Sequence, residues 1–406
     1  MREWAHLGCV DTGSELVLAE RGGALGVITL NRPAAVNALN LEMVEAIHRA
    51  LDAFATDDAV HAVMLRGAGE RGLCAGGDVR VIYQGTLGDP AVAMDFFAAE
   101  YRLDYAISYF PKPFIPLMDG LVLGGGVGIS VPGSHRIVNE TSRVGMPEAG
   151  IGFSPDVGAA YFLARSPGAV GCFLSLTGLH IGAADALYSG LADAFVPSAS
   201  WDALIAQLER VSSSAEVDDV VAGFADPVTD AHEEAPGAGR LELARGWIDE
   251  VFSRDSVEEI FAALQDRAET AGNDSLEQSA LDAMRRNSPT GMKTALEALK
   301  RAPNLSLAET YKQDYRLCGN AVLGNRTLPA EPRGGASGVQ RPGHDMREGI
   351  RAQIIDKDRN PQWKPATFED VDADLVSSFF ATVPGFPDLA FPDAGSAKKS
   401  AERRSN

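Results

Sequence analysis

The sequence predicts an α/β fold that gives way to a mainly α-helical carboxyl-terminal region. From Leu16 to about Pro197, short runs rich in β-branched and aliphatic residues alternate with amphipathic helical patterns. From about Ala203 to Leu323 strand signals almost vanish, and helical stretches follow one another across short breaks. At 406 residues the chain exceeds the size at which one hydrophobic core usually stops growing. We therefore expect a principal domain and a second packed unit.

The individual elements follow from local patterns. LVLAE and LGVITL flank the turn RGGA and predict a β-hairpin. Asn40 is placed to cap a helix in which apolar residues recur at helical spacing from Leu41 to Phe54. Further strands are predicted at VHAVMLRG and KPFIPLMDG, and further helices at ELARGWIDEVFS, VEEIFAALQDRAE, LEQSALDAMRRN and GMKTALEALKRA.

Changes in composition mark the predicted boundaries. Residues 226–239 are polar with Gly and Pro and predict an exposed loop, and residues 324–343 have almost no apolar side chains. The chain end is rich in Lys, Arg and Ser without apolar periodicity. The predicted segments are a core (14–200), a helical region (201–323), a surface insertion (324–343), a carboxyl-terminal segment (344–385) and a disordered tail (386–406).

Composition and charge exclude several classes of protein. Apolar residues make up 45% and charged residues 23%, as in globular proteins, and every apolar run is interrupted before the length of a membrane helix. The net charge of −20 repels nucleic acid and anionic membrane surfaces. The amino terminus shows no signal or transit pattern, so a cytoplasmic location is expected. The four cysteines lie far apart and are interpreted as reduced packing residues rather than as disulfides or zinc ligands.

Two glycine-rich turns, each after a predicted strand, are the first candidate for chemistry. They are RGLCAGGDVR, from Arg71 to Arg80, and LVLGGGVGIS, from Leu121 to Ser130. A strand that ends in glycines and enters a helix exposes backbone N–H groups where negative charge is stabilised. Two such turns together would form an oxyanion hole, in which each donor contributes about 3 kcal/mol to lowering a barrier. Alternatively, the glycines only mark tight turns, with Asp78 as the cap of the next helix.

Carboxylates in apolar surroundings are the second candidate. Glu148 and Asp156 lie in MPEAGIGFSPDVGAAYF, a stretch otherwise free of charge, and paired acids in such a setting can divide acid and base roles. Asp156 also precedes an apolar helix, so an N-cap role is equally open. Glu100 shares a helix face with Phe96 and Phe97, which suggests partial burial, although a lone Glu there is more often salt-bridged at the surface.

Together these strings resemble a known family. ITLNRPAAVNALN, CAGGD, DGLVLGGGVG, MPE, IGFSPDVG and TGLHIGAADALYSGLADAFVP occur in this order, as in the enoyl-CoA hydratase/isomerase (crotonase) superfamily. The resemblance implies a crotonase-like spiral of ββα units with a helical carboxyl-terminal part, and an acyl-CoA substrate. It places the thioester oxygen between the N–H groups of Gly77 and Gly125. It implies no metal and no cofactor, since coenzyme A is part of the substrate.

One branch of the superfamily, the 3-hydroxyisobutyryl-CoA hydrolases, resembles the chain beyond the core. Its likeness extends to EYRL near Glu100 and to GHDMREGIRAQIIDKDRNPQWKPA, residues 343–366, which short hydratases lack. The resemblance implies that Glu148 acts as base or attacking carboxylate. It also implies that Asp156 and Glu100, with Gly125 and Glu148, bind a short 3-hydroxyacyl-CoA of the kind formed in valine degradation. Hydratases usually carry a second Glu where this chain has Gly128, which disfavours simple hydration.

Two departures from the family pattern and two alternative functions remain. Family members often carry a Lys near the CoA phosphates, and this chain has Ala34 in its place, so Arg71 or Arg66 would have to bind the phosphates instead. The insertion 324–343 precedes the branch-specific run.

An enoyl-CoA or dienoyl-CoA isomerase or hydratase is the alternative enzyme. An acyl-CoA-binding or assembly protein without turnover is the alternative class. The expected partners are a small-molecule acyl-CoA and further copies of the chain in a homo-oligomer, with neither nucleic acid nor membrane.

Overall fold

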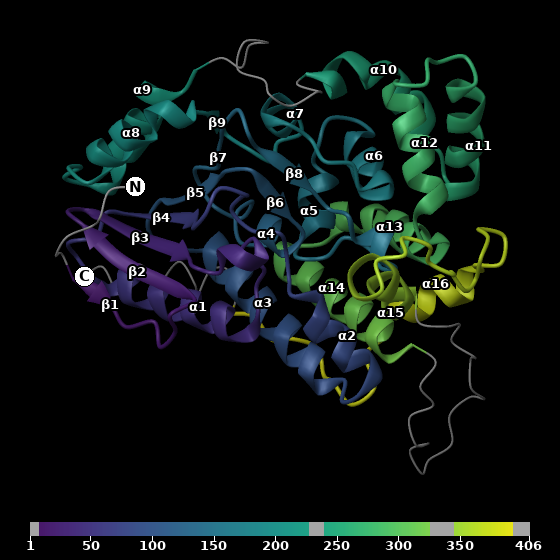
Figure 1. The fold of residues 1–406 in the computed structure, drawn as a ribbon, viewed down its shortest axis with the longest axis horizontal. Helices are drawn as coiled ribbons and strands as arrows, with labels where there is room; N and C mark the ends of the chain where they lie inside the picture. Colours follow the sequence, from purple (N-terminus) through teal and green to yellow (C-terminus); the bar gives the residue numbers. More distant parts are fainter. Residues whose placement is uncertain (1–7, 227–238, 325–344, 393–406) are drawn as a thin grey trace.

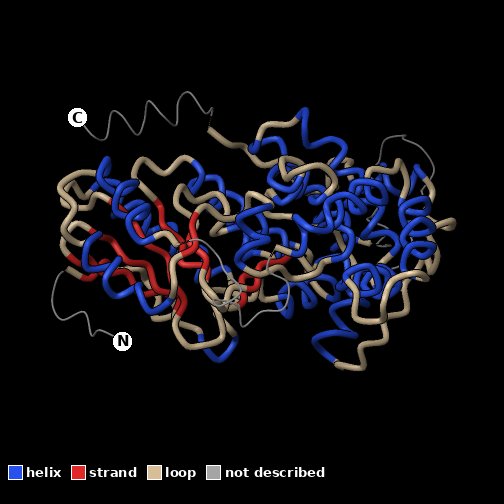
Figure 2. The backbone as a smooth tube through the Cα atoms, turned by 90° about the horizontal axis from the view of Figure 1, so that it is seen from above, coloured by secondary structure: helices blue, strands red, loops and turns tan. Residues whose placement is uncertain are grey.

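The computed structural model describes residues 8–226, 239–324 and 345–392. The strands gather at one end of the molecule and most of the helices at the other (Figure 1 and Figure 2). The predicted loop at 226–239 and the predicted insertion at 324–343 lie almost wholly outside the described residues. No helix in the described ranges has the length and apolar character that a bilayer crossing needs.

A seven-stranded sheet forms the framework of the first half. Its spatial order is β1 (Cys9–Val10), β2 (Val17–Gly22), β3 (Leu25–Leu30), β4 (Ala62–Gly67), β5 (Phe114–Met118), β7 (Ile137–Val138) and β9 (Ala194–Phe195). The predicted hairpin is confirmed, because β2 and β3 pair antiparallel with Ala19 opposite Ile28. From β3 to β9 all pairs are parallel. The central strands β3 and β5 are apolar and buried along their whole length, as strands covered on both faces must be.

Helices cover both faces of this sheet (Figure 1). Successive side chains of a strand point to opposite faces, so β4 contributes Val63 and Leu65 to one core and Ala62 and Met64 to another. The first core also takes in α1 (Leu41–Thr56) and α3 (Ala91–Ser108), and the second takes in α8 (Trp201–Leu208) and α9 (Val217–Phe224). As predicted, the Asn40 side chain caps α1 by accepting a hydrogen bond from Met43 N at 2.9 Å.

Shorter elements connect the sheet to the helical region. They are α2 (Val79–Leu87), β6 (Leu121–Leu123), α4 (Gly125–Gly128), β8 (Arg143–Gly145), α5 (Ala159–Leu163), α6 (Val170–Thr177) and α7 (Ala183–Tyr188). Strands β6 and β8 form a separate parallel pair. Single 3₁₀ turns lie at Pro33–Ala35, Ser198–Ser200, Ser214–Glu216 and Ala302–Asn304.

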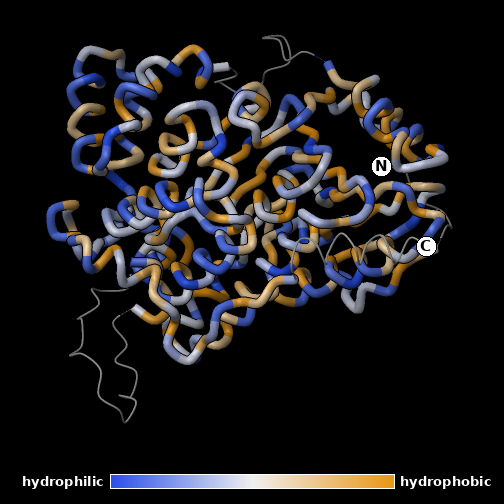
Figure 3. Tube along the Cα trace, turned by 180° about the vertical axis from the view of Figure 1, so that it is seen from behind, coloured by the Kyte–Doolittle hydropathy of each residue, from blue (hydrophilic) through white to orange (hydrophobic). Residues whose placement is uncertain are grey.

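The second half is helical, as predicted. It contains α10 (Arg240–Phe252), α11 (Val257–Ala268), α12 (Leu276–Arg286), α13 (Pro289–Arg301), α14 (Leu307–Leu323), α15 (Asp345–Ile350) and α16 (Ala373–Phe379). A serine side chain caps each of α11, α12, α13 and α14. Along the outer helices polar and apolar positions alternate (Figure 3). The apolar faces join the first core, which therefore runs from the sheet to the last described residues.

The predicted tail at 386–406 begins too early. Leu389 is buried, Asp388 forms an ion pair with Arg316 of α14, and Tyr105 of α3 donates a hydrogen bond to the carbonyl of Pro392 at 2.6 Å. Residues 386–392, FPDLAFP, carry apolar side chains without helical or strand spacing, so no periodic pattern indicated this docking in the sequence. Residues 393–406 lie outside the described residues.

Helices α13 and α15 together hold one short turn, η2 (Glu148–Ile151). Ser288 at the start of α13 donates its backbone N–H to Ala149 O at 2.9 Å, and its hydroxyl donates to Asp345 of α15 at 2.6 Å. Gly349 packs directly on Ile151, since an ideal Cβ on Gly349 would lie 2.3 Å from the carbonyl carbon of Ile151. The late run of the sequence thereby supports the turn that carries Glu148.

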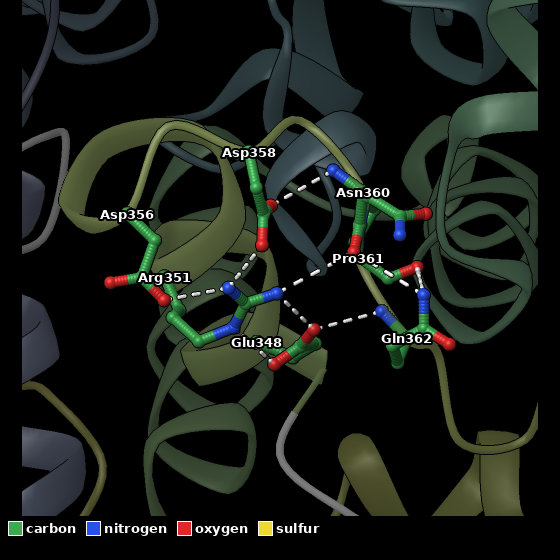
Figure 4. A network of polar contacts seen from close by, with 7 residues as sticks. All are labelled: Glu348, Arg351, Asp356, Asp358, Asn360, Pro361 and Gln362. Carbon is green, nitrogen blue, oxygen red and sulfur yellow. Dashed lines mark hydrogen bonds and ion pairs between the residues drawn. The ribbon is translucent and has the colours of Figure 1, made fainter.

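An arginine-centred network stabilises the loop that follows α15 (Figure 4). Arg351 donates two hydrogen bonds to Glu348, at 2.8 and 2.9 Å, and one each to Asp356 at 2.7 Å and Asp358 at 2.6 Å. Glu348 in turn accepts a hydrogen bond from the Gln362 backbone N–H at 2.8 Å. The bidentate geometry and the shared acceptors tie the loop to the helix more firmly than an isolated surface pair would.

Replacing Gly349 with Ala should destabilise the protein by about 1–3 kcal/mol, because the added methyl group collides with the Ile151 backbone. Gly246 in α10 is the matched control, since a Cβ there meets nothing within 4 Å. Gly246→Ala should stabilise the protein by about 0.5–1 kcal/mol through helix propensity. Chemical denaturation of both variants measures the difference. Equal stability of the two variants would show that α15 does not pack on the Glu148 turn.

Candidate active site

The two glycine-rich turns lie side by side, as predicted. Cys74 of the first turn donates its N–H to Leu121 O at 3.1 Å, and its carbonyl accepts from Leu123 N at 3.0 Å. Positive φ at Gly76 (+103°) lets the chain turn three residues before α2, and positive φ at Gly124 (+50°) lets it turn directly before α4. Strand-like pairing between the turns thus fixes the spacing of the residues that follow them.

The N–H groups of Gly77 and Gly125 are available for a ligand. Neither has a hydrogen-bond acceptor in the described parts of the chain. Gly125 is the first residue of α4, so its N–H has no intrahelical partner. Leu39 pairs with the residues on either side of Gly77, through Gly76 O and Asp78 N, which leaves the Gly77 N–H pointing away from Leu39.

The two amide nitrogens are close enough to share one oxygen. An ideal Cβ on Gly125 would lie 3.2 Å from Gly77 N. Because Cβ and N of one residue are about 2.5 Å apart, the two nitrogens are separated by no more than about 5.7 Å. Two N–H···O bonds of about 2.9 Å each can span that distance.

The carboxyl groups of Glu148 and Glu100 face these turns, and that of Asp156 lies near both acids. Glu148 lies at the start of η2, and its Oε1 is 2.8 Å from the position of a Cβ on Gly124. Glu100 lies on α3, and its Oε1 is 2.3 Å from the position of a Cβ on Gly125. Asp156 lies in the segment after η2, and all three carboxyl groups are buried. The structure therefore brings together every residue that the sequence nominated for the site.

The sequence missed two further members of the group. Asp104, one turn after Glu100 on α3, is fully buried, and Asp314 of α14 accepts a hydrogen bond from Gly158 N at 2.8 Å. The spacing of four residues from Glu100 could have indicated Asp104. Nothing local to Asp314 signalled its role, because its partner is distant in sequence. We call these five residues, Glu100, Asp104, Glu148, Asp156 and Asp314, the carboxyl cluster.

Five oxygen atoms of the carboxyl cluster lack a hydrogen-bond partner among the described residues. Glu100 Oε1, Glu148 Oε2, Asp314 Oδ1 and both oxygens of Asp104 accept no hydrogen bond from the described residues. Asp156 differs, since its Oδ2 accepts from Tyr101 Oη at 2.5 Å and from Cys318 Sγ at 3.4 Å. No group of side chains in the described ranges is arranged to hold a metal ion.

The acids of the carboxyl cluster differ in their hydrogen-bond donors and therefore differ in pKa. Burial raises the pKa of Glu100, Asp104, Glu148 and Asp314 well above the ordinary values, and the nearby charge of Asp156 adds to the rise. Burial also raises the pKa of Asp156, but the hydrogen bonds from Tyr101 and Cys318 oppose it, and the pKa is about 6. Asp156 is therefore the most acidic member of the carboxyl cluster.

Three interpretations of single residues are wrong. Glu100 is not a surface residue in an ion pair, because it is 2% exposed and has no cation beside it in the described structure. Asp156 is not a helix cap, since α5 begins after Gly158, and positive φ at Val157 (51°) turns the chain so that the carboxylate points to α3 and α14. Cysteines were predicted to be packing residues, which is wrong for the exposed Cys9, whereas Cys74 and Cys318 are buried in the core and Cys318 also donates a hydrogen bond to Asp156.

The two basic residues suggested by the sequence have different surroundings. Arg71 Nη2 donates hydrogen bonds to the carbonyls of Pro33 and Ala34, at 2.6 and 2.7 Å, so its charge lies beside position 34. Arg66 donates to Thr29 Oγ1 on the sheet at 2.9 Å, and burial lowers its pKa. Of the two, Arg71 carries a cation to the place where the sequence has Ala34.

Replacing Asp104 with Asn should stabilise the protein increasingly as pH rises. Its pKa is raised by burial and by Glu100, so the folded state holds a proton that the unfolded chain releases above the ordinary value of 3.8. The free energy of unfolding of the natural chain therefore decreases as pH rises through this range. Asn cannot ionise, so the variant does not show this decrease. We expect a gain of about 1–2 kcal/mol at pH 8 and little difference at pH 3.5.

Chemical denaturation across this pH range measures the effect. Asp95→Asn on the exposed face of α3 is the control and should follow the natural chain. A stability difference for Asp104→Asn that is constant with pH would mean that Asp104 is as acidic as an exposed carboxylate.

Comparison with known proteins places the chain in a family. The family model described as enoyl-CoA hydratase/isomerase matches residues 25–380. The chain is 35% identical to the mitochondrial 3-hydroxyisobutyryl-CoA hydrolase of Gallus gallus, over 91% of this chain and 89% of that protein. It is 34% identical to 3-hydroxyisobutyryl-CoA hydrolase 1 of Arabidopsis thaliana, over 93% of this chain and 94% of that protein.

Solved structures agree on the fold. A carnitinyl-CoA dehydratase from Mycobacterium thermoresistibile has a TM-score of 0.79 at 40% identity, covering 94% of this chain and all of that one. An enoyl-CoA hydratase from Rhodobacter sphaeroides has a TM-score of 0.77 at 38% identity, covering 93% of this chain and all of that one. The predicted crotonase-like fold is thus confirmed. The chain belongs to the enoyl-CoA hydratase/isomerase (crotonase) superfamily and, within it, to the family of the 3-hydroxyisobutyryl-CoA hydrolases.

Proposed function

We propose that this protein hydrolyses the thioester of a short 3-hydroxyacyl-CoA of the 3-hydroxyisobutyryl type, as in valine degradation. The observation that carries the proposal is the pair of unpartnered amides of Gly77 and Gly125 beside the buried carboxyl group of Glu148. Relatives with the corresponding name, similar over about nine-tenths of the chain, support it.

In the proposed reaction the thioester oxygen accepts hydrogen bonds from Gly77 N and Gly125 N. Negative charge then develops on an oxygen that these donors already face, which lowers the barrier without reorganisation. Glu148 either takes a proton from the attacking water or attacks the carbonyl carbon itself and forms a mixed anhydride that water opens. In both routes the C–S bond breaks, and the coenzyme A thiolate leaves and takes up a proton.

Asp156 and Glu100 hold the 3-hydroxyl group of the substrate and tune Glu148. Burial raises the pKa of Glu148, and the charge of Asp156 adds to the rise. A carboxylate acting as base or nucleophile must be ionised. Activity therefore falls as pH falls through this raised pKa, on the acid side of the profile.

Hydration or isomerisation of an enoyl-CoA is the second candidate. The titles of the two solved structures name a dehydratase and a hydratase. Against this, position 128 is Gly and has no room for a side chain, since a Cβ there would lie 2.7 Å from Val157 Cβ and 2.8 Å from Asp104 Oδ2. A second acid on α4, which two-carboxylate hydration would use, is thus absent.

Thiol release from 3-hydroxyisobutyryl-CoA, 3-hydroxypropionyl-CoA and crotonyl-CoA tests the proposal. We expect release from the first two and little from crotonyl-CoA, because only 3-hydroxy substrates give Asp156 and Glu100 a hydroxyl to bind. Glu148→Gln should abolish turnover while leaving acyl-CoA binding within about threefold, since the amide keeps the shape but cannot act as base or nucleophile.

Three results would contradict this proposal. Full residual hydrolysis in Glu148→Gln would remove Glu148 from the mechanism. Double-bond migration or hydration of crotonyl-CoA without thiol release would favour the second candidate. Tight acyl-CoA binding without turnover of any of the three thioesters would indicate a binding protein.

Arg71 is proposed to contact the phosphates of coenzyme A in place of a lysine at position 34. Arg71→Ala should raise KM for the acyl-CoA about tenfold, corresponding to one lost charge-assisted contact, with kcat nearly unchanged. The acyl-pantetheine thioester, which lacks the nucleotide phosphates, is the control substrate. If Arg71→Ala weakens use of the acyl-pantetheine equally, Arg71 acts on the turn itself and not on phosphate.

Two expectations from the sequence stay predictions. The animal relatives are named as mitochondrial proteins, so the cytoplasmic location expected for this chain stays a prediction. The same holds for assembly into a homo-oligomer.

A further inference from the structure

The surroundings of Asp156 hold a feature that the proposed mechanism does not use. Tyr101 Oη, Cys318 Sγ and Asp156 Oδ2 form a closed triangle with sides of 2.5, 3.1 and 3.4 Å. A phenol carries one hydrogen, so Tyr101 donates it over the shortest side to Asp156, and the Cys318 thiol hydrogen points to the same carboxylate oxygen. All three side chains are buried.

These three residues come from separate parts of the fold. Tyr101 follows Glu100 on α3, Asp156 lies after η2, and Cys318 lies on α14. The remaining titratable groups around Asp156 are Glu100 and Asp104 on α3, Glu148 on η2, and Tyr311 and Asp314 on α14. Every one of these groups is acidic, so within the described part of the chain no neighbouring cation stabilises a charge on Asp156.

Hydrogen bonds therefore decide which member of the carboxyl cluster is ionised. Donors aimed at a buried carboxylate favour its charged form, whereas a carboxyl group without donors is more stable when it keeps its proton. Asp156 receives two side-chain donors, while Glu148 Oε2 and both oxygens of Asp104 receive none from the described residues.

Tyr311 provides an internal comparison. Its ring is stacked on that of Tyr101, with centroids 6.0 Å apart, and it is just as buried. Its hydroxyl has no hydrogen-bond partner in the described residues. Two tyrosines in the same place thus differ in whether the hydroxyl reaches Asp156.

We propose that Tyr101 and Cys318 are positioning residues that orient Asp156 and keep it as the ionised member of the carboxyl cluster. The inference rests on the proposed function in one respect, because the proposed function has the carboxylate of Asp156 bind the 3-hydroxyl group of the substrate. The charge maintained on Asp156 also adds to the rise that burial causes in the pKa of Glu148.

The first test is a titration without substrate. Carboxyl carbon NMR of the full chain, labelled at Asp, follows Asp156 in the natural protein, Tyr101→Phe, Cys318→Ala, Cys318→Ser and Tyr311→Phe, with Asp156→Asn to assign the signal. Tyr101→Phe and Cys318→Ala should raise the pKa of Asp156 by about one unit or more, since each removes a donor to the charged form. Cys318→Ser keeps a donor and should stay near the natural value, as should Tyr311→Phe.

The second test uses the S–H stretching band in the infrared spectrum, which the Cys318 variants assign. In the natural protein this band should shift as Asp156 titrates, because the thiol donates to the carboxylate more strongly than to the acid. If Tyr101→Phe fails to fold, this band and the Ala and Ser variants of Cys318 still decide the question.

The proposal is overturned if the band does not respond to pH, or if Ala and Ser at position 318 move the titration equally. It is also overturned if Tyr101→Phe and Tyr311→Phe behave alike. Neither method requires turnover, so a protein without thioesterase activity but with the expected titrations would contradict the proposed function alone. Where hydrolysis is measured, the acid limb of kcat/KM, which the ionisation of Glu148 sets, should move to lower pH in Tyr101→Phe and Cys318→Ala, because a protonated Asp156 no longer raises the pKa of Glu148, and it should return in Cys318→Ser.

Discussion

The site depends on one constraint: the two glycine-rich turns must approach each other with no side chain between them. At Gly125 a single methyl group would lie 2.3 Å from Glu100 Oε1 and 3.2 Å from Gly77 N. The absence of that methyl group lets a carboxyl group and an amide from another turn reach the same small volume. Backbone pairing between the turns, through Cys74, then holds this spacing without the entropy loss that long side chains would incur.

Placing five acids in one apolar interior opposes folding. Each must either keep a proton or be stabilised as an anion by donors, and the structure supplies side-chain donors chiefly to Asp156. The apolar core that extends from the sheet to the carboxyl-terminal helices offsets this cost. Local features that weaken a fold and persist in it are characteristic of functional sites.

Patterns within one segment were sufficient to predict much of this protein. The hairpin, the Asn40 cap, the later helices and the two glycine turns each depend on neighbouring residues, and the motif order identified the family. Predictions of side-chain roles failed where the hydrogen-bond partner lies far away in the sequence. Asp156 looked like a helix cap because its local context is Pro155 followed by an apolar run, and only the fold reveals the phenol of Tyr101 and the thiol of Cys318. The missing signal for Asp314 has the same cause.

The support of the Glu148 turn has a consequence for how the chain can be divided. Ser288 and Asp345, which lie far beyond the sheet in the sequence, are hydrogen-bonded to each other, and Ser288 also donates its backbone N–H to Ala149 in the four-residue turn that carries Glu148. The motifs shared across the superfamily lie before position 200, yet the turn that carries Glu148 is supported by residues near the other end of the chain. A fragment that keeps all the motifs shared across the superfamily would still lack the residues that support the turn of Glu148.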